Sequence, residues 1–192
     1  MLSAGDAVAW LADLGVIASA EEVEDAARSV TSTDGVRFVP ALSGLGSPHF
    51  DFGARSCFVG LTRGSSAAHL ARAVLEGVAH TVADAAAAAG VSGPLRVDGG
   101  VARDRLLLEM VADLTGLVVE RAPVVDATSL GAALWAGLAT GVWSAREEAA
   151  ALWPPAESIE PSGRDVSTDR AAWAEALAGA KEWLPEFSSL PL

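Results

Sequence analysis

The sequence predicts an α/β domain. Short apolar runs, typical of buried strands, alternate along the chain with longer segments in which apolar residues recur every three or four positions. The chain has 192 residues, of which 51% are hydrophobic and 20% are charged, enough for one substantial domain with its own core. The sequence has no internal repeat, so we expect a single α/β unit rather than an array of repeated units.

The first half of the chain is expected to contain three helices and two strands. A helical pattern starts near Ala4, and Gly15 supplies its stop. Ser19 and Glu22 have the spacing of a capping box, which predicts a short second helix. Two strand-like runs and a long helix capped by serines come next, at residues 36–39, 57–61 and 67–89.

The second half continues the alternation. Leu95–Val97 is expected to be a short buried strand, followed by the pair Gly99–Gly100 and then by an amphipathic helix. A further strand ends at Pro123, and the small-residue helix that follows it, 126–143, is expected to pack on the sheet. The remaining elements are a loop at 156–170, an amphipathic helix carrying Trp173, Leu177 and Trp183, and a frayed tail at 185–192.

The charge balance limits the classes of partner. The formal net charge is −12, which argues against a protein that binds nucleic acid by neutralising phosphates with clustered Lys and Arg. A small nucleotide is not excluded, because backbone N–H groups can hold a phosphate locally. The sequence has neither an apolar run of about 18 residues nor a basic segment before an apolar one, so we expect a cytoplasmic protein that does not bind membranes.

No metal site is expected in the chain. Cys57 is the only cysteine, which excludes a disulfide framework and a thiolate cluster within the chain. His49, His69 and His80 do not have the spacing of zinc ligands. A structural or surface role is expected for all three histidines.

The glycine pair is the strongest local candidate for a binding site. Gly99 and Gly100 lie where a strand gives way to a helix, and without Cβ atoms they would let the main chain come close to a ligand. The N–H groups at the start of the next helix would then face that ligand. The plain alternative is a tight strand-to-helix turn, because the spacing matches neither a P-loop nor a dinucleotide fingerprint. Asp98 could be a metal ligand or a general base, but its place at the end of a strand favours a cap for the turn. Asp104 lies one helical turn past Gly100 and could face the same ligand, although a residue at such a position is usually a solvated one in the helix.

Two longer stretches carry a resemblance to a known family. The block SCFVGLTRGSSAAHLARAVLE (Ser56–Glu76) resembles the second signature of the FGGY carbohydrate kinases. Within that family, VPALSGLGSPHFDFGARSCFVGLTRG most closely resembles the glycerol kinases. The segment from Arg96 to Trp143 is similar to the family's nucleotide-binding turn and the helices after it.

The resemblance implies a specific fold and domain organisation. Kinases of this family have two actin-like domains, related to ribonuclease H, with ATP in the cleft between them. The chain is similar to the C-terminal part of the second domain. Residues 1–153 would then form part of the nucleotide-binding domain, and residues 154–192 would pack on it as a loop, a helix and a tail.

The resemblance also implies which residues hold the nucleotide. Gly99 and Gly100 correspond to the family's glycine turn, and Gly5 corresponds to a glycine at the start of an earlier helix. Asp104 stands where the family has an asparagine near the adenine. Ala9 stands where glycerol kinases commonly offer glutamine, so this contact to ATP or ADP would be lost.

The resemblance places catalysis outside the chain. In the family the first domain carries the polyol pocket, the catalytic aspartate, and contacts to phosphate and to the Mg²⁺ that accompanies the nucleotide. We therefore expect no catalytic residue and no metal ligand here, and no phosphorylation by the isolated chain. The complete enzyme would convert ATP and glycerol to glycerol 3-phosphate and ADP.

The missing portion has consequences for partners. Loss of the first strands of the domain would expose a sheet edge or an apolar surface. We therefore expect self-association or pairing with a separately encoded N-terminal half. Two other functions stay open at this stage, a kinase for another sugar or polyol and a non-catalytic remnant that acts as an interaction module.

Overall fold

The computed structural model describes residues 4–124, 126–151 and 155–188. Its helices are α1 (Ala4–Asp13), α2 (Val23–Arg28), α3 (Ala67–Ala88), α4 (Arg105–Thr115), α5 (Ala127–Thr140), α6 (Arg146–Ala151), α7 (Ser167–Ala180) and α8 (Pro185–Ser188), with 3₁₀ helices η1 (Ala20–Glu22) and η2 (Val101–Arg103). Its strands are β1 (Arg37–Val39), β2 (Cys57–Val59), β3 (Leu95–Val97), β4 (Val119–Arg121) and β5 (Glu157–Ile159). The predicted α/β class is confirmed, whereas the predicted domain boundary at 153–154 and the tail residues 189–192 lie outside the described ranges.

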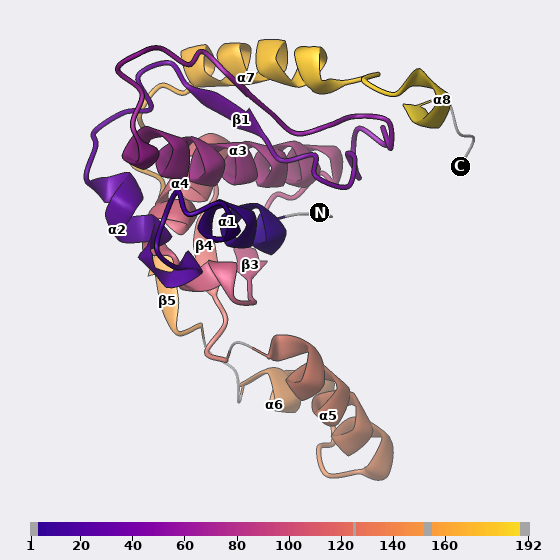
Figure 1. Cartoon of the computed structure of the whole chain (residues 1–192). Coiled ribbons are helices and arrows are strands. Elements are labelled where there is room, and N and C mark those ends of the chain that lie inside the picture. Colours follow the sequence, from indigo (N-terminus) through magenta and orange to yellow (C-terminus); the bar gives the residue numbers. More distant parts are fainter. Residues whose placement is uncertain (1–3, 125, 152–154, 189–192) are drawn as a thin grey trace.

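Helix α3 is the centre of the fold. Figure 1 shows it between β1 on one side and α1 and α4 on the other, with α7 lying across β1. Along α3, residues Val74, Leu75 and Val78 are at most 1% exposed. Helix α3 begins directly after its N-cap Ser66, whose main-chain N–H donates a hydrogen bond to Nδ1 of His69 at 3.1 Å. The serine cap expected from the sequence is therefore present.

An aromatic row fastens α1 to the strands beside α3. The ring of Trp10 in α1 stacks on Phe38 in β1 with centroids 6.0 Å apart, and Phe38 lies 4.6 Å from Phe58 in β2. Strands β1 and β2 pair in antiparallel fashion, with Phe38 opposite Phe58. This row fixes the position of the helix that carries Gly5 near its start.

A second, three-stranded sheet supports the glycine turn. Strand β3 pairs in parallel with β4, and β4 pairs in antiparallel fashion with β5. Because side chains alternate along a strand, one face carries Leu95, Val119 and Ile159, and the other carries Arg96, Glu120 and Ser158. The apolar residues belong to the main core together with α4. The opposite face is therefore polar, and β3 forms one edge of the sheet.

The C-terminal helix α7 is held by a polar network and a ring stack. Asp84 of α3 accepts hydrogen bonds from Trp173 Nε1 at 2.9 Å and from Arg170 of α7, and it contacts His49 Nε2 at 2.9 Å. The ring of His80 stacks on Trp173 with centroids 5.0 Å apart. Burial lowers the pKa of His80 to about 4, so this histidine is neutral in the folded protein. These contacts join α7 to α3 and to the segment that carries His49.

Several local predictions were wrong. Ser19 makes no side-chain cap hydrogen bond, because the chain enters a 3₁₀ turn there before α2 begins. The segment expected to be a loop contains β5, which finds its partner in β4 rather than in a neighbouring segment. Trp183 lies beyond the end of α7 and is 66% exposed. The expected tail begins with the short helix α8, which is joined to Gly53 through a hydrogen bond from Leu184 N.

Helix α5 does not pack on the sheet, contrary to the prediction. Figure 1 shows α5 and α6 set apart from the rest of the molecule. Within α5 only Gly137 is buried, against the ring of Trp143, whereas Trp135 is 61% exposed. The apolar face of the sheet is already covered by α4, and its outward face is polar. The described sheet therefore has no apolar surface to offer to α5.

No helix in the described part of the chain is long and apolar enough to cross a membrane.

Gly77 permits the close approach of α3 to β1, which can be tested by substitution. A Cβ at this position would overlap the main-chain oxygen of Phe38. We expect Gly77→Ala to lower the free energy of unfolding by roughly 1–3 kcal/mol, because the helix must move away from the strand. The measurement is chemical denaturation followed by circular dichroism. Gly179→Ala in α7 is the control, since its Cβ would meet nothing within 4 Å; an equal loss in both variants would contradict the account.

Candidate nucleotide-binding site

A hollow of about 390 Å³ lies beside the turn that follows β3. It is bordered by the start of α1, by η1 and α2, and by η2. Three residues singled out from the sequence line it, Gly5, Gly100 and Asp104. A volume of this size is in the range of small-molecule sites.

The main chain at Gly100 is bare and faces open space. Gly100 has φ −60° and ψ −44°, a conformation open to any residue, and a Cβ there would meet nothing within 4 Å. Gly5 is more confined, because its Cβ would lie 3.5 Å from Cγ2 of Val101. Both glycines therefore contribute main chain without a side chain to the lining of the hollow.

Gly99 has a different place from the other three predicted residues. It does not line this hollow but a neighbouring one, of about 240 Å³, which also includes Asp98 and Arg121. Its φ of +92° lies in the region that side chains disfavour. Gly99 thus turns the chain between β3 and η2.

Asp104 is the N-cap of α4 and is buried. The sequence suggested a solvated residue in the helix, but η2 intervenes, so α4 begins only at Arg105. The Asp104 Oδ1 atom accepts from Leu107 N at 2.9 Å, and the residue is 8% exposed. Its Oδ2 atom is shielded from solvent and has no hydrogen-bond partner among the described residues. Burial raises the pKa of Asp104 to about 6.

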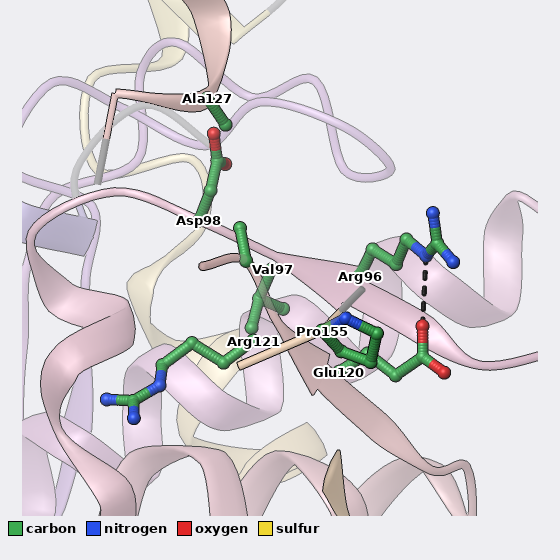
Figure 2. A pocket seen from close by; sticks show the side chains of 8 residues that line it. Arg96, Val97, Asp98, Glu120, Arg121, Ala127 and Pro155 are labelled. Atoms are coloured by element: carbon green, nitrogen blue, oxygen red, sulfur yellow. Dashed lines mark hydrogen bonds and ion pairs between the residues drawn. The ribbon is translucent and has the colours of Figure 1, made fainter. Parts of the chain in front are cut away.

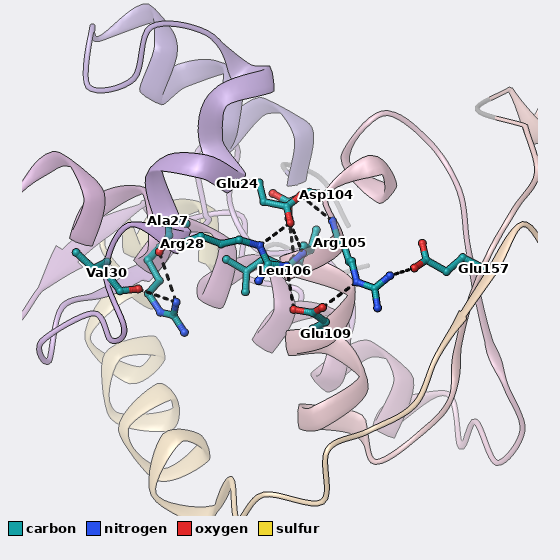
Figure 3. A network of polar contacts seen from close by, with 11 residues as sticks. Glu24, Ala27, Arg28, Val30, Asp104, Arg105, Leu106, Glu109 and Glu157 are labelled. Atoms are coloured by element: carbon teal, nitrogen blue, oxygen red, sulfur yellow. Dashed lines mark hydrogen bonds and ion pairs between the residues drawn. The ribbon is translucent and has the colours of Figure 1, made fainter.

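Glu24 is a site residue that sequence reasoning missed. Its Oε2 accepts from Arg105 N at 2.9 Å and its Oε1 accepts from Leu106 N at 3.2 Å (Figure 3). Together with Asp104, it occupies the first three N–H groups of α4. The expectation that these groups would face a ligand was therefore wrong. The sequence offered one signal, the spacing of Glu24 and Arg28, which form an ion pair at 2.8 Å.

A chain of ion pairs continues from Glu24 across the surface. Arg28 also contacts Glu109 of α4 at 3.0 Å, and Arg105 contacts both Glu109, at 3.0 Å, and Glu157 of β5 (Figure 3). Each exposed pair contributes little by itself. As a network they tie α2, α4 and β5 together around the amino end of α4.

The charges around the hollow indicate what it can accept. Glu21, Glu24 and Asp104 line it with a single cation, Arg103. The pKa of Glu21 is lowered because its carboxylate accepts hydrogen bonds from its own main-chain N–H and from the side chain of Ser19, so this residue is ionised at neutral pH. An acidic lining disfavours phosphate and favours a neutral group that donates hydrogen bonds.

Another hollow, of about 290 Å³, lies over the polar side of the sheet. Figure 2 shows Arg96 directed at Glu120, with which it pairs at 2.9 Å, and Arg121 pointing away. Of the glycines and aspartates that the sequence singled out as candidate site residues, only Asp98 lines this hollow. Across the described residues, no group of three or more His, Cys, Asp or Glu side chains could hold a metal ion.

Comparison with known proteins identifies the relatives of the chain. Residues 1–140 match the family described as "FGGY family of carbohydrate kinases, C-terminal domain". A glycerol kinase of Rhodopirellula baltica is 46% identical across 97% of the chain, and one of Solidesulfovibrio magneticus is 45% identical across 94%. The chain spans only 36% and 38% of the length of these two relatives.

Solved structures show the same fold. A glycerol kinase of Plasmodium falciparum with ADP has a TM-score of 0.77 and 28% identity, covering 98% of this chain and 38% of that one. A xylulose kinase of Lactobacillus acidophilus with bound ligand also has a TM-score of 0.77, at 22% identity, covering 90% of this chain and 36% of that one. The actin-like fold expected from the sequence is thereby confirmed.

Proposed function

Because the chain belongs to the FGGY family of carbohydrate kinases, whose C-terminal domain it matches, we propose that it is the nucleotide-binding part of a glycerol kinase. The complete enzyme transfers a phosphoryl group from ATP to glycerol and yields glycerol 3-phosphate and ADP. This part contributes the surface against which the adenosine portion of the nucleotide lies.

The observation that carries the proposal is the hollow between Gly5 and Gly100. Two glycines from segments far apart in the sequence border it, and the Cβ-free main chain at Gly100 faces open space. A flat base can approach a surface of this kind closely. The Plasmodium falciparum relative was solved with ADP, which supports an adenine nucleotide as the ligand.

The proposal assigns the chemistry to the rest of the enzyme. Phosphoryl transfer depends on positioning and charge stabilisation between two walls of a closed cleft. The acidic hollow does not favour phosphates, so their contacts and those of the accompanying Mg²⁺ are assigned to the other domain. The chain by itself is therefore proposed to bind nucleotide without phosphorylating glycerol.

We also propose a surface for the remainder of the kinase. Helix α5 exposes Trp135, and β3 forms a sheet edge, so both offer groups that another polypeptide could cover. The relatives are more than twice as long as this chain, which supplies a natural occupant. Without that occupant, whether it belongs to the same chain or to a separate one, this surface promotes self-association.

A substitution at Gly100 tests nucleotide binding. We expect the chain to bind ADP measurably and Gly100→Leu to weaken binding by about tenfold or more, because the new side chain fills the place of the base. Isothermal titration calorimetry gives the affinities. Gly179→Leu, whose Cβ would also meet nothing within 4 Å, is the control and should bind as the parent does.

Two outcomes would contradict the nucleotide proposal. If the parent chain does not bind ADP at millimolar concentration, the non-catalytic remnant becomes the better interpretation. If Gly100→Leu binds ADP as tightly as the parent, the nucleotide lies elsewhere on the chain.

Replacement of Trp135 tests the proposed surface on α5. We expect the chain to self-associate as its concentration rises and Trp135→Arg to reduce that association, because a charge replaces the exposed apolar ring. Sedimentation velocity measures the distribution of species. Trp183→Arg is the control, since Trp183 is 66% exposed but lies outside α5. A parent chain that stays monomeric throughout would contradict the proposal.

A further inference from the structure

We propose that a second hollow, over α3 and α4, binds a small zwitterion, an α-amino acid whose carboxylate is held by Arg37 and whose ammonium group is held by Glu76. The hollow has a volume of about 640 Å³ and lies between the loop 31–35, the start of β1, α3, α4 and the segment that leads into α7. It shares no lining residue with the hollow beside Gly100. The inference is therefore independent of the proposed function.

The lining of this hollow carries charges of both signs. Its charged side chains are three arginines and five carboxylates, Arg37, Arg72, Arg164, Asp34, Glu76, Glu109, Asp113 and Asp169. Because the carboxylates outnumber the guanidinium groups, a simple anion is disfavoured there. A ligand that fits must present a positive group to the carboxylates.

Two of the three arginines are already engaged by carboxylates of the same lining. Arg164 pairs with Asp113 at 3.0 Å and with Asp169 at 2.7 Å. Arg72 of α3 donates through Nε to Glu76 at 3.2 Å, one helical turn further along. These two guanidinium groups balance the lining and leave the third as the candidate for a ligand.

Arg37 is held in place but keeps an available donor. Its Nη1 donates to Thr33 Oγ1 at 2.7 Å and to the main-chain oxygen of Val36 at 3.1 Å. Its Nη2 lies 3.8 Å from Asp169, which is too far for a hydrogen bond. Nε is shielded from solvent, so Nη2 is the group that a ligand can reach on this side chain, which is 16% exposed. A guanidinium fixed in this way is pre-organised for a carboxylate oxygen.

Glu76 supplies the opposite charge on the neighbouring helix. Its Oε1 accepts from Arg72, and its side chain is 23% exposed. Burial raises the pKa of Glu76 and Asp169 raises it further, whereas Arg72 and Arg37 lower it. An ammonium group beside this carboxylate would offset the cost of its burial in the ionised form.

The lining also offers a small apolar surface. Leu106 and Met110 of α4 border the hollow, and they are 7% and 6% exposed. An aliphatic side chain can lie against them while the two charged groups of the same molecule reach Arg37 and Glu76. A cation without a carboxylate would leave Arg37 Nη2 unpaired, and a neutral polyol would match hydrogen bonds but not charges. An aliphatic α-amino acid satisfies all three parts of the lining.

The test compares L-valine with molecules that lack one of its charged groups. 3-Methylbutanoate lacks the ammonium group, isobutylamine lacks the carboxylate, and glycerol represents a neutral polyol. We expect L-valine to bind the chain at pH 7.5 about tenfold more tightly than each of the other three, the effect of one hydrogen bond to a charged group. Amide chemical shifts in NMR titrations give the affinities, and the largest shifts are expected at Gly35 and Arg37, which line the hollow.

Glu76→Gln is the decisive variant. Its amide oxygen can still accept from Arg72, but the negative charge that holds the ammonium group is gone. The variant should bind L-valine and 3-methylbutanoate within about twofold of each other, because the ammonium group no longer has a carboxylate partner at this position. Glu160→Gln, at an exposed position outside the hollow, is the control and should keep the parent's preference. Thermal unfolding shows whether each variant is folded.

Three outcomes would overturn the inference. The first is the absence of a saturable shift at Gly35 and Arg37 when L-valine is added to the parent chain. The second is glycerol binding as tightly as L-valine, which would make the hollow a polyol site. The third is a Glu76→Gln variant that is folded and still prefers L-valine to 3-methylbutanoate. None of these results affects the nucleotide site, which the Gly100→Leu variant tests separately.

Discussion

The amino end of α4 is held by two carboxylates, and the form of the candidate site depends on this contact. Glu24, from α2, binds the main-chain N–H groups of Arg105 and Leu106, and Asp104 binds that of Leu107. Since α2 is joined to α4 in this way, η1, η2 and Gly100 are brought to the rim of one hollow. Without the Glu24 contact, the helix would begin with unpaired N–H groups and the side of the hollow formed by α2 would lose its anchor.

This arrangement gives the helix terminus a role other than the one usual for phosphate sites. A free helix N-terminus attracts anions through its N–H groups and its dipole. Here the protein's own carboxylates take that position, and the hollow is acidic. Under the proposed function it therefore suits the uncharged base and sugar of a nucleotide, and the proposal assigns the phosphate contacts to the remainder of the kinase. The relatives are more than twice as long as this chain.

The features that the sequence predicted correctly are those that depend on local chemistry. The strand Leu95–Val97 and the glycine turn follow from an apolar run and from residues without Cβ atoms. Glu24 could not be predicted as a helix cap, since the N–H groups that it binds lie 81 and 82 residues away. β5 escaped prediction for the same reason, because three residues become a strand only when β4 supplies the partner. The position of α5 was predicted wrongly, because packing on the sheet needs an open apolar face that the described sheet does not have.

The central claim is that a nucleoside base lies against the bare main chain at Gly100. A map of amide chemical shifts on addition of saturating adenosine tests it most directly, when supplemented by nuclear Overhauser contacts to the base protons. The account predicts the largest shifts at Gly5, Gly100 and Val101, with contacts from the base to the α-protons of both glycines. Shifts centred instead on the polar face of the sheet, around Arg96 and Glu120, would contradict it.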